Sequence, residues 1–278
     1  MSDGRTNFVI VHGAWTGGWS WMRVVDRLHD RGHRAFAPTL TGLCERSHLN
    51  AVGVDLEMHI TDIVNEIVWK DLADVVLVAH SYGGLVGAGV VERIPERIAS
   101  LVFVDAFIAE DNTSFADMVP GWEPTEALIA SPPTSPGDYL DEADRAWVDT
   151  KACPQPAGTM TQRMRVTGAY KRVPKKMFVV ATGWDGFQGT AEKLEREGGW
   201  TVHRLACGHD VPIDMPDRFR GIQYLDPDKC IVCNQCARIC PTDCITIAGK
   251  PNPDPEKKGK VLDTFDINFE ICILCDLC

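Results

Sequence analysis

Residues 75–86 constrain the fold of this chain more than any other stretch of the sequence. The stretch begins with β-branched and aliphatic residues, which indicate a strand buried in a parallel sheet, and it continues into small and apolar residues at helical spacing. Ser81 stands where the predicted strand turns into the predicted helix. A sharp turn of this kind strains the serine backbone, exposes Oγ above the sheet edge and requires small residues two positions away on either side, here Ala79 and Gly83. The stretch therefore predicts a nucleophilic serine at the end of a central strand, with Ala79 where the usual pattern has a glycine.

Predicted strands and helices alternate on both sides of this turn. We expect further strands over residues 8–11, 34–38, 101–104, 177–181 and 200–205, and helices over residues 21–31, 56–68, 82–93 and 190–197. Such alternation gives right-handed βαβ units and a parallel sheet, so the predicted fold class is α/β. Prolines interrupt the pattern over residues 111–173, which we expect to form a cap inserted after a sheet strand.

Composition limits the functions that are open to the chain. A net charge of −11 argues against sequence-independent binding to nucleic acid or to anionic membranes. No apolar run approaches the roughly 20 residues of a membrane span, and the polar start of the chain predicts no signal peptide. We therefore expect a cytoplasmic protein.

The cysteines divide the chain into two unlike parts. Eight of the 11 cysteines fall between Cys230 and Cys278, which without a secretion signal indicates metal ligation rather than disulfides. The alternating strand and helix pattern ends at Asp217, so we expect one domain over residues 1–217 and a second over residues 218–278. Cys44 lies near the expected mouth of the active site, where we expect it to act as a small apolar filler.

The remaining catalytic groups follow from the order of the chain. Folds that use this serine turn place an acid and then a histidine after the nucleophile, and Asp185 and His209 stand in predicted loops that follow strands. Asp105, at the end of an earlier strand, is the alternative acid, and the sequence favours Asp185. The glycine-rich turn over residues 12–19 can expose backbone N–H groups to an oxyanion.

Five motifs in the first part resemble those of small esterases related to plant methyl-ester esterases and hydroxynitrile lyases, over residues 7–217. They are the residues 12–21, 38–42, 79–83, 181–185 and 208–210. The resemblance implies an α/β-hydrolase fold with Ser81 as nucleophile, His209 as general base and Asp185 as orienting acid, and it implies an oxyanion hole made by the N–H groups of Ala14 and Tyr82. The hydroxynitrile lyase branch resembles a pattern with threonine in place of Gly13 and lysine in place of Asp210. This chain has neither residue, so it is expected to hydrolyse a small carboxylic ester rather than cleave a cyanohydrin.

The cysteine spacing of the second part is typical of iron–sulfur proteins. Cys-x2-Cys-x2-Cys-x3-Cys-Pro is the bacterial 4Fe–4S signature, and a second run follows it; the cysteines are Cys230, Cys233, Cys236 and Cys240, then Cys272, Cys275 and Cys278. Residues 218–278 resemble the two-cluster ferredoxin-like subunit of NADH–quinone oxidoreductases, and the polar segment 250–260 also fits that subunit.

This resemblance implies one complete and one incomplete cluster site. Cys240 would join the second run of cysteines, whereas Cys230, Cys233 and Cys236 lack a fourth ligand before the chain ends. Cys244 does not stand at a ligand position of the family pattern, and we expect it to pack.

The sequence thus predicts a serine esterase fused to a C-terminally truncated iron–sulfur electron-transfer module with a redox partner. Two alternatives stay open. One is an electron-transfer protein with a non-catalytic hydrolase half, and the other is a non-natural chimera, because the junction near residue 217 omits a last helix on one side and a ligand on the other.

Overall fold

The computed structural model describes residues 5–50, 53–119, 121–124, 126–219, 232, 245–252 and 260–267. The chain divides into two compact units, Met1–Phe219 and Arg220–Cys278. This division lies within two residues of the junction that the sequence pattern predicts.

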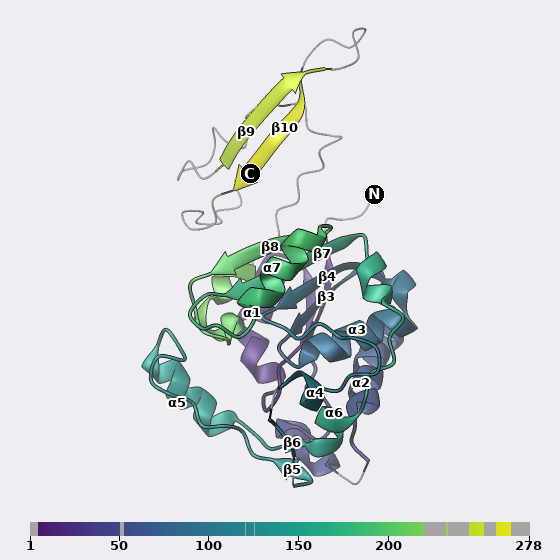
Figure 1. The fold of residues 1–278 in the computed structure, drawn as a ribbon, viewed down its shortest axis with the longest axis vertical. Coiled ribbons are helices and arrows are strands. Elements are labelled where there is room, and N and C mark those ends of the chain that lie inside the picture. The colour runs from purple at the N-terminus through teal and green to yellow at the C-terminus, as the bar shows by residue number, and fades with distance from the viewer. Residues whose placement is uncertain are drawn as a thin grey trace. The chain divides into compact units, whose positions relative to one another are not determined.

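The first unit is built on one six-stranded parallel sheet (Figure 1). Its strand order is β2-β1-β3-β4-β7-β8, with the bounds β1 (Asn7–Val11), β2 (Arg34–Phe36), β3 (Val75–His80), β4 (Ile98–Val104), β7 (Lys175–Ala181) and β8 (Thr201–Leu205). The predicted α/β class is confirmed. The strand β3 lies between β1 and β4, where its Ala79 pairs with Val11 on one side and Phe103 on the other. The order reverses between β1 and β3, and ligands of open α/β sheets bind at the carboxyl ends of strands at such a reversal.

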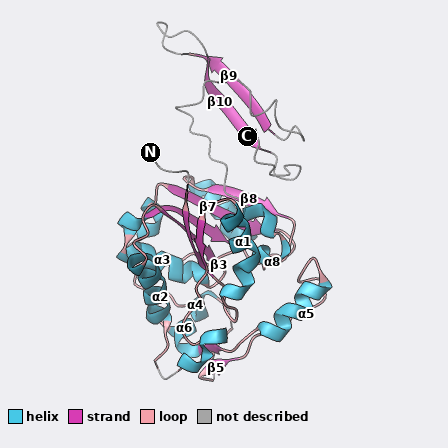
Figure 2. Ribbon diagram, turned by 180° about the vertical axis from the view of Figure 1, so that it is seen from behind, coloured by secondary structure: helices cyan, strands magenta, loops and turns pink. Residues whose placement is uncertain are grey.

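Helices cover both faces of this sheet (Figure 2). They are α1 (Met22–Asp30), α2 (Leu56–Trp69), α3 (Gly83–Arg93), α7 (Gln188–Glu197) and α8 (Val211–Asp214), and the 3-10 turns are η1 (Gly18–Trp21), η2 (Cys44–Leu49), η3 (Pro95–Arg97), η4 (Ala169–Arg172) and η5 (Pro216–Phe219). Because successive strand side chains point to opposite faces, β1 contributes Val9 and Val11 to the apolar cluster under α2, α3 and α7, and Phe8 and Ile10 to the cluster under α1 and α8. The strands therefore read as continuous apolar runs.

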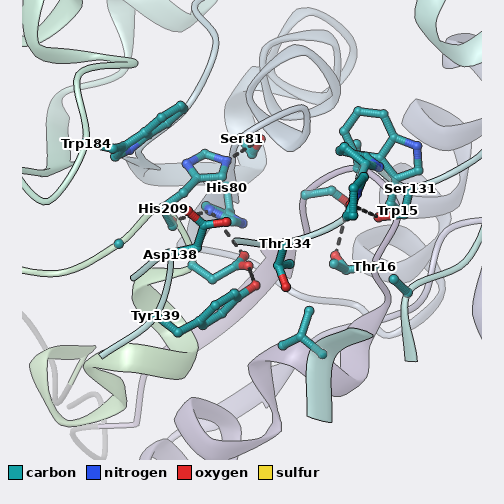
Figure 3. A pocket seen from close by; sticks show the side chains of 18 of the residues that line it. Trp15, Thr16, His80, Ser81, Ser131, Thr134, Asp138, Tyr139, Trp184 and His209 are labelled. Carbon is teal, nitrogen blue, oxygen red and sulfur yellow. Dashed lines mark hydrogen bonds and ion pairs between the residues drawn. The ribbon is translucent and has the colours of Figure 1, made fainter. Parts of the chain in front are cut away.

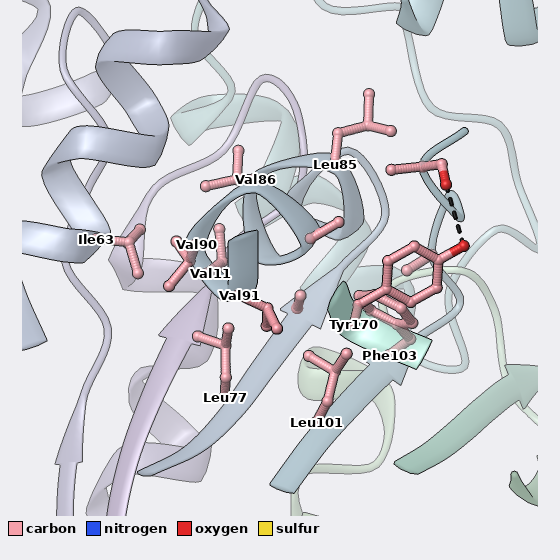
Figure 4. Close-up of a cluster of buried hydrophobic side chains, with 14 of the residues drawn as sticks. Val11, Ile63, Leu77, Leu85, Val86, Val90, Val91, Leu101, Phe103 and Tyr170 are labelled. Atoms are coloured by element: carbon pink, nitrogen blue, oxygen red, sulfur yellow. Dashed lines mark hydrogen bonds between the residues drawn. The ribbon is translucent and has the colours of Figure 1, made fainter. Parts of the chain in front are cut away.

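The helix α3 packs unusually close to the sheet. Its residues from Gly83 to Val91 are all buried, and Val90 and Val91 belong to the same apolar cluster as Leu77 of β3 (Figure 4). A methyl group at Gly87 would lie 3.0 Å from the Cβ of Ala79. Gly87 thus makes room for the alanine that replaces the usual first glycine of the serine turn, and this close approach fixes where the turn ends.

A long insertion, residues 105–174, separates β4 from β7 and includes the segment expected as a cap. It contains α4 (Phe115–Met118), β5 (Leu128–Ile129), α5 (Glu142–Lys151), β6 (Gln155–Pro156) and α6 (Ala157–Thr161), with β5 and β6 antiparallel. The helix α5 contacts α1 and η1. Arg23 of α1 donates to Asp144 at 2.7 Å, and Trp147 packs edge-on against Trp19 of η1, with ring centroids 4.9 Å apart. The insertion is thereby anchored to the sheet domain at its middle.

The second unit contains an antiparallel hairpin of β9 (Ile245–Pro251) and β10 (Lys260–Ile267). The polar segment 250–260 joins the two strands, and Lys250 and Asp263 pair across them at 3.0 Å. All seven cysteines predicted as iron ligands lie outside the described residues. Within the described part of the chain, no helix is long and apolar enough to cross a membrane.

Candidate active site

The serine turn forms at the predicted place. The strand β3 ends at His80, α3 begins at Gly83, and Ser81 between them has a φ of 53°, in the left-handed region that costs a serine free energy. A side chain at position 83 would place its Cβ 2.7 Å from the carbonyl oxygen of His12. Only glycine fits there, so the turn holds the Ser81 hydroxyl at the carboxyl edge of the sheet.

His209 connects this serine to a carboxylate. Its Nε2 lies 2.9 Å from Ser81 Oγ, and its Nδ1 lies 2.7 Å from Asp105 Oδ2. Since a carboxylate only accepts, the Nδ1–H donates to Asp105 and the Nε2 is free to accept the serine proton. Oγ, imidazole and carboxylate form one continuous chain of hydrogen bonds.

Asp105 is held in place by its backbone and, besides His209, by two other N–H donors. It directly follows β4, is fully buried, and has a φ of 43°. The N–H of Ala181 donates to Oδ1 at 3.0 Å, and the indole N–H of Trp184 donates to Oδ2 at 2.6 Å. With His209, three N–H groups orient this carboxylate.

The sequence-based preference for Asp185 as the partner of His209 is corrected by this geometry. Asp185 is exposed in the loop after β7, and its neighbour Trp184 enters the site instead, with its ring 4.6 Å from the His209 ring. The loop is fixed by Gly183, whose N–H donates to the carbonyl of Cys207 at 2.9 Å and whose position leaves no room for a side chain. The alternative acid, Asp105, occupies the place expected of Asp185. The sequence offered both aspartates at the ends of strands, and only the loop geometry after β7 distinguishes them.

The two predicted oxyanion donors flank the serine. Ala14 lines the cavity beside Ser81, and Tyr82 precedes the first turn of α3, so that its N–H points out of the helix start. Among the described residues, neither N–H has a hydrogen-bond acceptor. Gly13 lets the two segments meet, because a Cβ there would lie 3.2 Å from the Cβ of Ser81. The two donors are therefore free to bind a ligand oxygen.

A cavity of about 340 Å³ opens onto the serine. Figure 3 shows His209 next to Ser81, with Trp184 on one side of the cavity and Trp15 and Ser131 on the other. The wall opposite the sheet comes from the insertion; its lining residues there are Ser131, Pro132, Pro133, Thr134, Gly137, Asp138, Tyr139, Val148 and Ala152. The sequence predicts this segment as a cap but does not indicate which of its residues line the cavity, because proline-rich connections carry no periodicity.

Three other histidines near the site are buried and structural. Burial lowers the pKa of His12, His59 and His80 to about 4, which keeps them neutral near pH 7. His80 donates from Nε2 to the carbonyl of His209 at 3.0 Å, and His12 accepts from the N–H of Leu40 at 3.1 Å. They fix the loops around His209 rather than exchange protons.

These histidines make the first unit sensitive to acid. His59 donates from Nε2 to Thr41 and accepts from the Tyr82 hydroxyl at Nδ1, with Asp55 and Arg46 the nearest charges. Because its folded pKa of about 4 lies below the ordinary 6.5, its contribution is complete above pH 6.5 and is lost as the pH falls toward 4. Lowering the pH from 7 to 5 therefore costs about 2 kcal/mol for this group, and His12 and His80 add in the same direction.

The measurement is urea unfolding at pH 7 and pH 5, followed by tryptophan fluorescence. All eight tryptophans precede residue 219, so the signal reports the first unit alone. The variant His59→Gln keeps a donor and an acceptor but does not titrate, and its loss of unfolding free energy between the two pH values should be about 2 kcal/mol smaller than that of the parent. The exposed His48→Gln is the matched control and should lose as much as the parent. Equal losses in His59→Gln and the parent would contradict the prediction.

No metal site is visible in the described residues, where no three His, Cys, Asp or Glu side chains are arranged to hold an ion. The described part of the chain contains three cysteines, Cys44, Cys153 and Cys207. The expected iron ligands belong to the part of the chain that is not described.

Known proteins match both parts of the chain. The alpha/beta hydrolase family matches residues 8–222, and the 4Fe-4S binding domain matches residues 224–246. The carbendazim hydrolyzing esterase of Nocardioides sp. (strain SG-4G) is 37% identical over 230 residues, which are 76% of this chain and 95% of the relative. A solved extracellular alpha/beta-hydrolase from a Paenibacillus species has the same fold, with a TM-score of 0.65, 24% identity, and coverage of 77% of this chain and 96% of the other.

The C-terminal part has a separate relative. NADH-quinone oxidoreductase subunit I 2 of Symbiobacterium thermophilum is 45% identical over 71 residues, which are 23% of this chain and 29% of the relative. The chain thus spans less than a third of that subunit. Together with the sheet, the serine turn and the hydrogen-bonded His209, these matches establish that the chain belongs to the alpha/beta hydrolase family, as a carboxylic ester hydrolase that continues into a 4Fe-4S binding domain.

Proposed function

We propose that the first unit hydrolyses a small carboxylic ester with Ser81 as nucleophile, His209 as general base and Asp105 as orienting acid. The observation that carries the proposal is the chain of hydrogen bonds from Ser81 Oγ through both nitrogens of His209 to Asp105, at 2.9 and 2.7 Å. This arrangement lets one imidazole accept a proton on the side that faces the substrate while a buried carboxylate stabilises the charge on the other side.

Each step of the reaction uses a group of the site. Ser81 Oγ attacks the ester carbonyl carbon and gives its proton to Nε2 of His209, while the carbonyl oxygen becomes an oxyanion between the N–H groups of Ala14 and Tyr82. As the carbon–oxygen bond to the alcohol breaks, the proton on Nε2 passes to the leaving alcohol. Water then attacks the acyl-enzyme with His209 again as base, which releases the acid and restores Ser81.

The cavity favours a compact substrate. Its volume of about 340 Å³ is at the lower end of the range for ligand pockets, and the insertion acts as a cap that forms its outer wall. Trp15 and Trp184 present aromatic surfaces on opposite sides (Figure 3). Carbendazim is a test substrate, because a relative named for hydrolysing it aligns along 95% of its own length.

The proposal is tested by trapping the nucleophile in the full chain. A fluorophosphonate should react once, abolish hydrolysis of p-nitrophenyl acetate and add its mass to the tryptic peptide 71–93, in which Ser81 is the only serine. Prior incubation with a slowly turned-over ester should slow the labelling. A label on another peptide, or hydrolysis that survives complete labelling of Ser81, would contradict the proposal.

We further propose that residues 218–278 hold one fully ligated 4Fe–4S cluster, on Cys240, Cys272, Cys275 and Cys278, and a labile second site on Cys230, Cys233 and Cys236. Support comes from the match of residues 224–246 to the 4Fe-4S binding domain and from the donor set, because four thiolates complete one cluster and three leave an iron open. A bound cluster would supply one-electron transfer to a redox partner.

Iron and sulfide analysis tests this assignment after anaerobic reconstitution and desalting. We expect about four iron and four sulfide to stay on each chain, with more lost during desalting from the three-cysteine site. Cys240→Ser should lose the stable cluster, whereas Cys244→Ser should keep it. Two equally stable clusters, or an unchanged cluster in Cys240→Ser, would overturn the assignment.

A further inference from the structure

Two cysteines that lie far apart in the sequence meet beside the active site. Cys44 begins η2, in the connection between β2 and α2, and Cys153 stands between α5 and β6 of the insertion. Their sulfur atoms lie 2.8 Å apart, although 109 positions separate the residues in the chain. The pair therefore bridges the sheet domain and the insertion.

Backbone contacts hold both thiols in this arrangement. Cys44 has a φ of 42°, and its N–H donates to the sulfur of Cys153 at 3.1 Å. The N–H of Cys153 donates to the carbonyl of Trp15 at 2.9 Å. The two side chains thus face each other because the backbone on each side is fixed, and forming a bond needs a shift of only about 1 Å.

The two thiols have unequal acidity. The hydrogen bond from Cys153 lowers the pKa of Cys44, and the Trp19 indole N–H at 3.4 Å and the positive charge of Lys151 lower it further, against the effect of burial. The same contact with Cys44, together with burial, raises the pKa of Cys153. The two pKa shifts make Cys44 the thiol that loses its proton more readily, and therefore the attacking group of the pair. Cys44 is therefore more than the apolar filler that the sequence predicts.

We propose that Cys44 and Cys153 form a reversible disulfide that ties the insertion to the sheet domain, with a low-molecular-weight disulfide as the oxidant. The Cys44 thiolate attacks one sulfur of oxidised glutathione, and the glutathione sulfur–sulfur bond breaks to release one glutathione thiolate. Cys153 then loses its proton to solvent and attacks the Cys44 sulfur, which releases the second glutathione. Two protein thiols are oxidised and one glutathione disulfide is reduced to two thiols.

The site is open to such a reagent. Cys44 lines a surface depression whose other lining residues are Gly18, Trp19, Met22, Ala37, Glu45 and Lys151. Lys151 and Glu45 place opposite charges at this depression, which can pair with the carboxylates and the amino groups of glutathione. Cys207, by contrast, is buried. The oxidant can therefore reach Cys44, whereas the packing of the sheet domain shields Cys207.

The bond would act on the cavity through Trp15. The insertion already holds Trp15 by three contacts: Gln155 accepts from its backbone N–H at 3.0 Å, the carbonyl of Ile129 accepts from its indole at 3.1 Å, and Cys153 donates to its carbonyl. Trp15 follows the proposed oxyanion donor Ala14 in the chain. A covalent link at Cys153 fixes this segment of the insertion to the sheet domain. It also closes a loop of about 110 residues, which lowers the entropy of the unfolded chain and so stabilises the folded one.

Peptide mapping of the full chain tests the bond directly. The chain is incubated anaerobically with oxidised glutathione, its free thiols are alkylated, and it is digested with trypsin. Cys44 and Cys153 are the single cysteines of peptides 35–46 and 152–163, so a linked pair of these peptides is expected, and it should disappear after dithiothreitol. Peptide 205–218, which carries Cys207, should stay alkylated in the same sample.

Thermal unfolding tests the tether. The midpoint followed by tryptophan fluorescence should rise by about 5 °C or more on oxidation and return on reduction. Cys44→Ser and Cys153→Ser should show neither the linked peptides nor the rise, and Cys153→Ser should accumulate a glutathione adduct on Cys44. The proposal fails if both thiols stay alkylated under oxidising glutathione, if the parent stops at the glutathione adduct, or if the link forms without raising the midpoint.

Discussion

Replacing Ser81 by alanine will lower kcat for p-nitrophenyl acetate by about 10⁵-fold or more. In the proposed mechanism Ser81 Oγ forms the bond to the acyl group, and His209 Nε2, which lies 2.9 Å away, removes the serine proton. Without Oγ, the histidine and the two oxyanion donors retain only the weak catalysis of water attack. The fold should survive, because alanine is smaller than serine and keeps the same backbone.

Ser131→Ala is the matched control. Ser131 also lines the cavity, but its hydroxyl donates to the carbonyl of Pro132 and not to His209. Its kcat should stay within about threefold of the parent, as for a substitution that removes no transition-state contact. Tryptophan fluorescence and unfolding midpoints of both variants show whether they are folded. Similar losses in the two variants, or turnover retained by folded Ser81→Ala, would end the assignment of Ser81.

Replacing Asp105 by asparagine will lower kcat by about 10⁴-fold. Oδ2 of Asp105 accepts from both His209 Nδ1 and Trp184 Nε1, at 2.7 and 2.6 Å. An amide nitrogen at that position would face two N–H donors, and the histidine would turn to the tautomer whose Nε2 carries a proton and cannot accept from Ser81. Asparagine is the substitution of choice because it tolerates a φ of 43°.

Asp185→Asn is the paired control, since it removes the same charge from the neighbouring loop. Asp185 is exposed, so its kcat should stay within about twofold of the parent. The two variants also differ in labelling: the fluorophosphonate should react slowly with Asp105→Asn and at the parent rate with Asp185→Asn. If Asp185→Asn shows the large loss and Asp105→Asn the small one, the geometry at His209 is not the catalytic one.

The sheet and the serine turn could be predicted from the sequence because their causes are local. A run such as residues 75–80 is apolar on both faces, and only a parallel strand with helices on both sides buries it. The turn at Ser81 needs Gly83 because a side chain there would meet the carbonyl oxygens of Val11 and His12 at the end of β1, but the strand, serine and glycine that signal the turn are neighbours in the chain. His209 could be found as well, since it follows the last predicted strand.

The acid could not be assigned in the same way. Asp105 and Asp185 both follow strands of the sheet, and both come between Ser81 and His209 in the chain. Which of them meets the imidazole depends on the loop after β7, where Gly183 packs against the carbonyl of Cys207 and Trp184 rather than Asp185 turns inward.

By itself, the sequence determined the α/β class, the position of the nucleophile and its histidine, and the presence of an iron–sulfur motif, because each is written in residues that are neighbours or that repeat at a fixed spacing. Only the tertiary structure decided that Asp105 holds His209, which residues of the insertion line the cavity, and that Cys44 meets Cys153 across 109 positions. These depend on contacts between distant segments, whose geometry is set by the packing of the whole sheet domain and not by any local pattern.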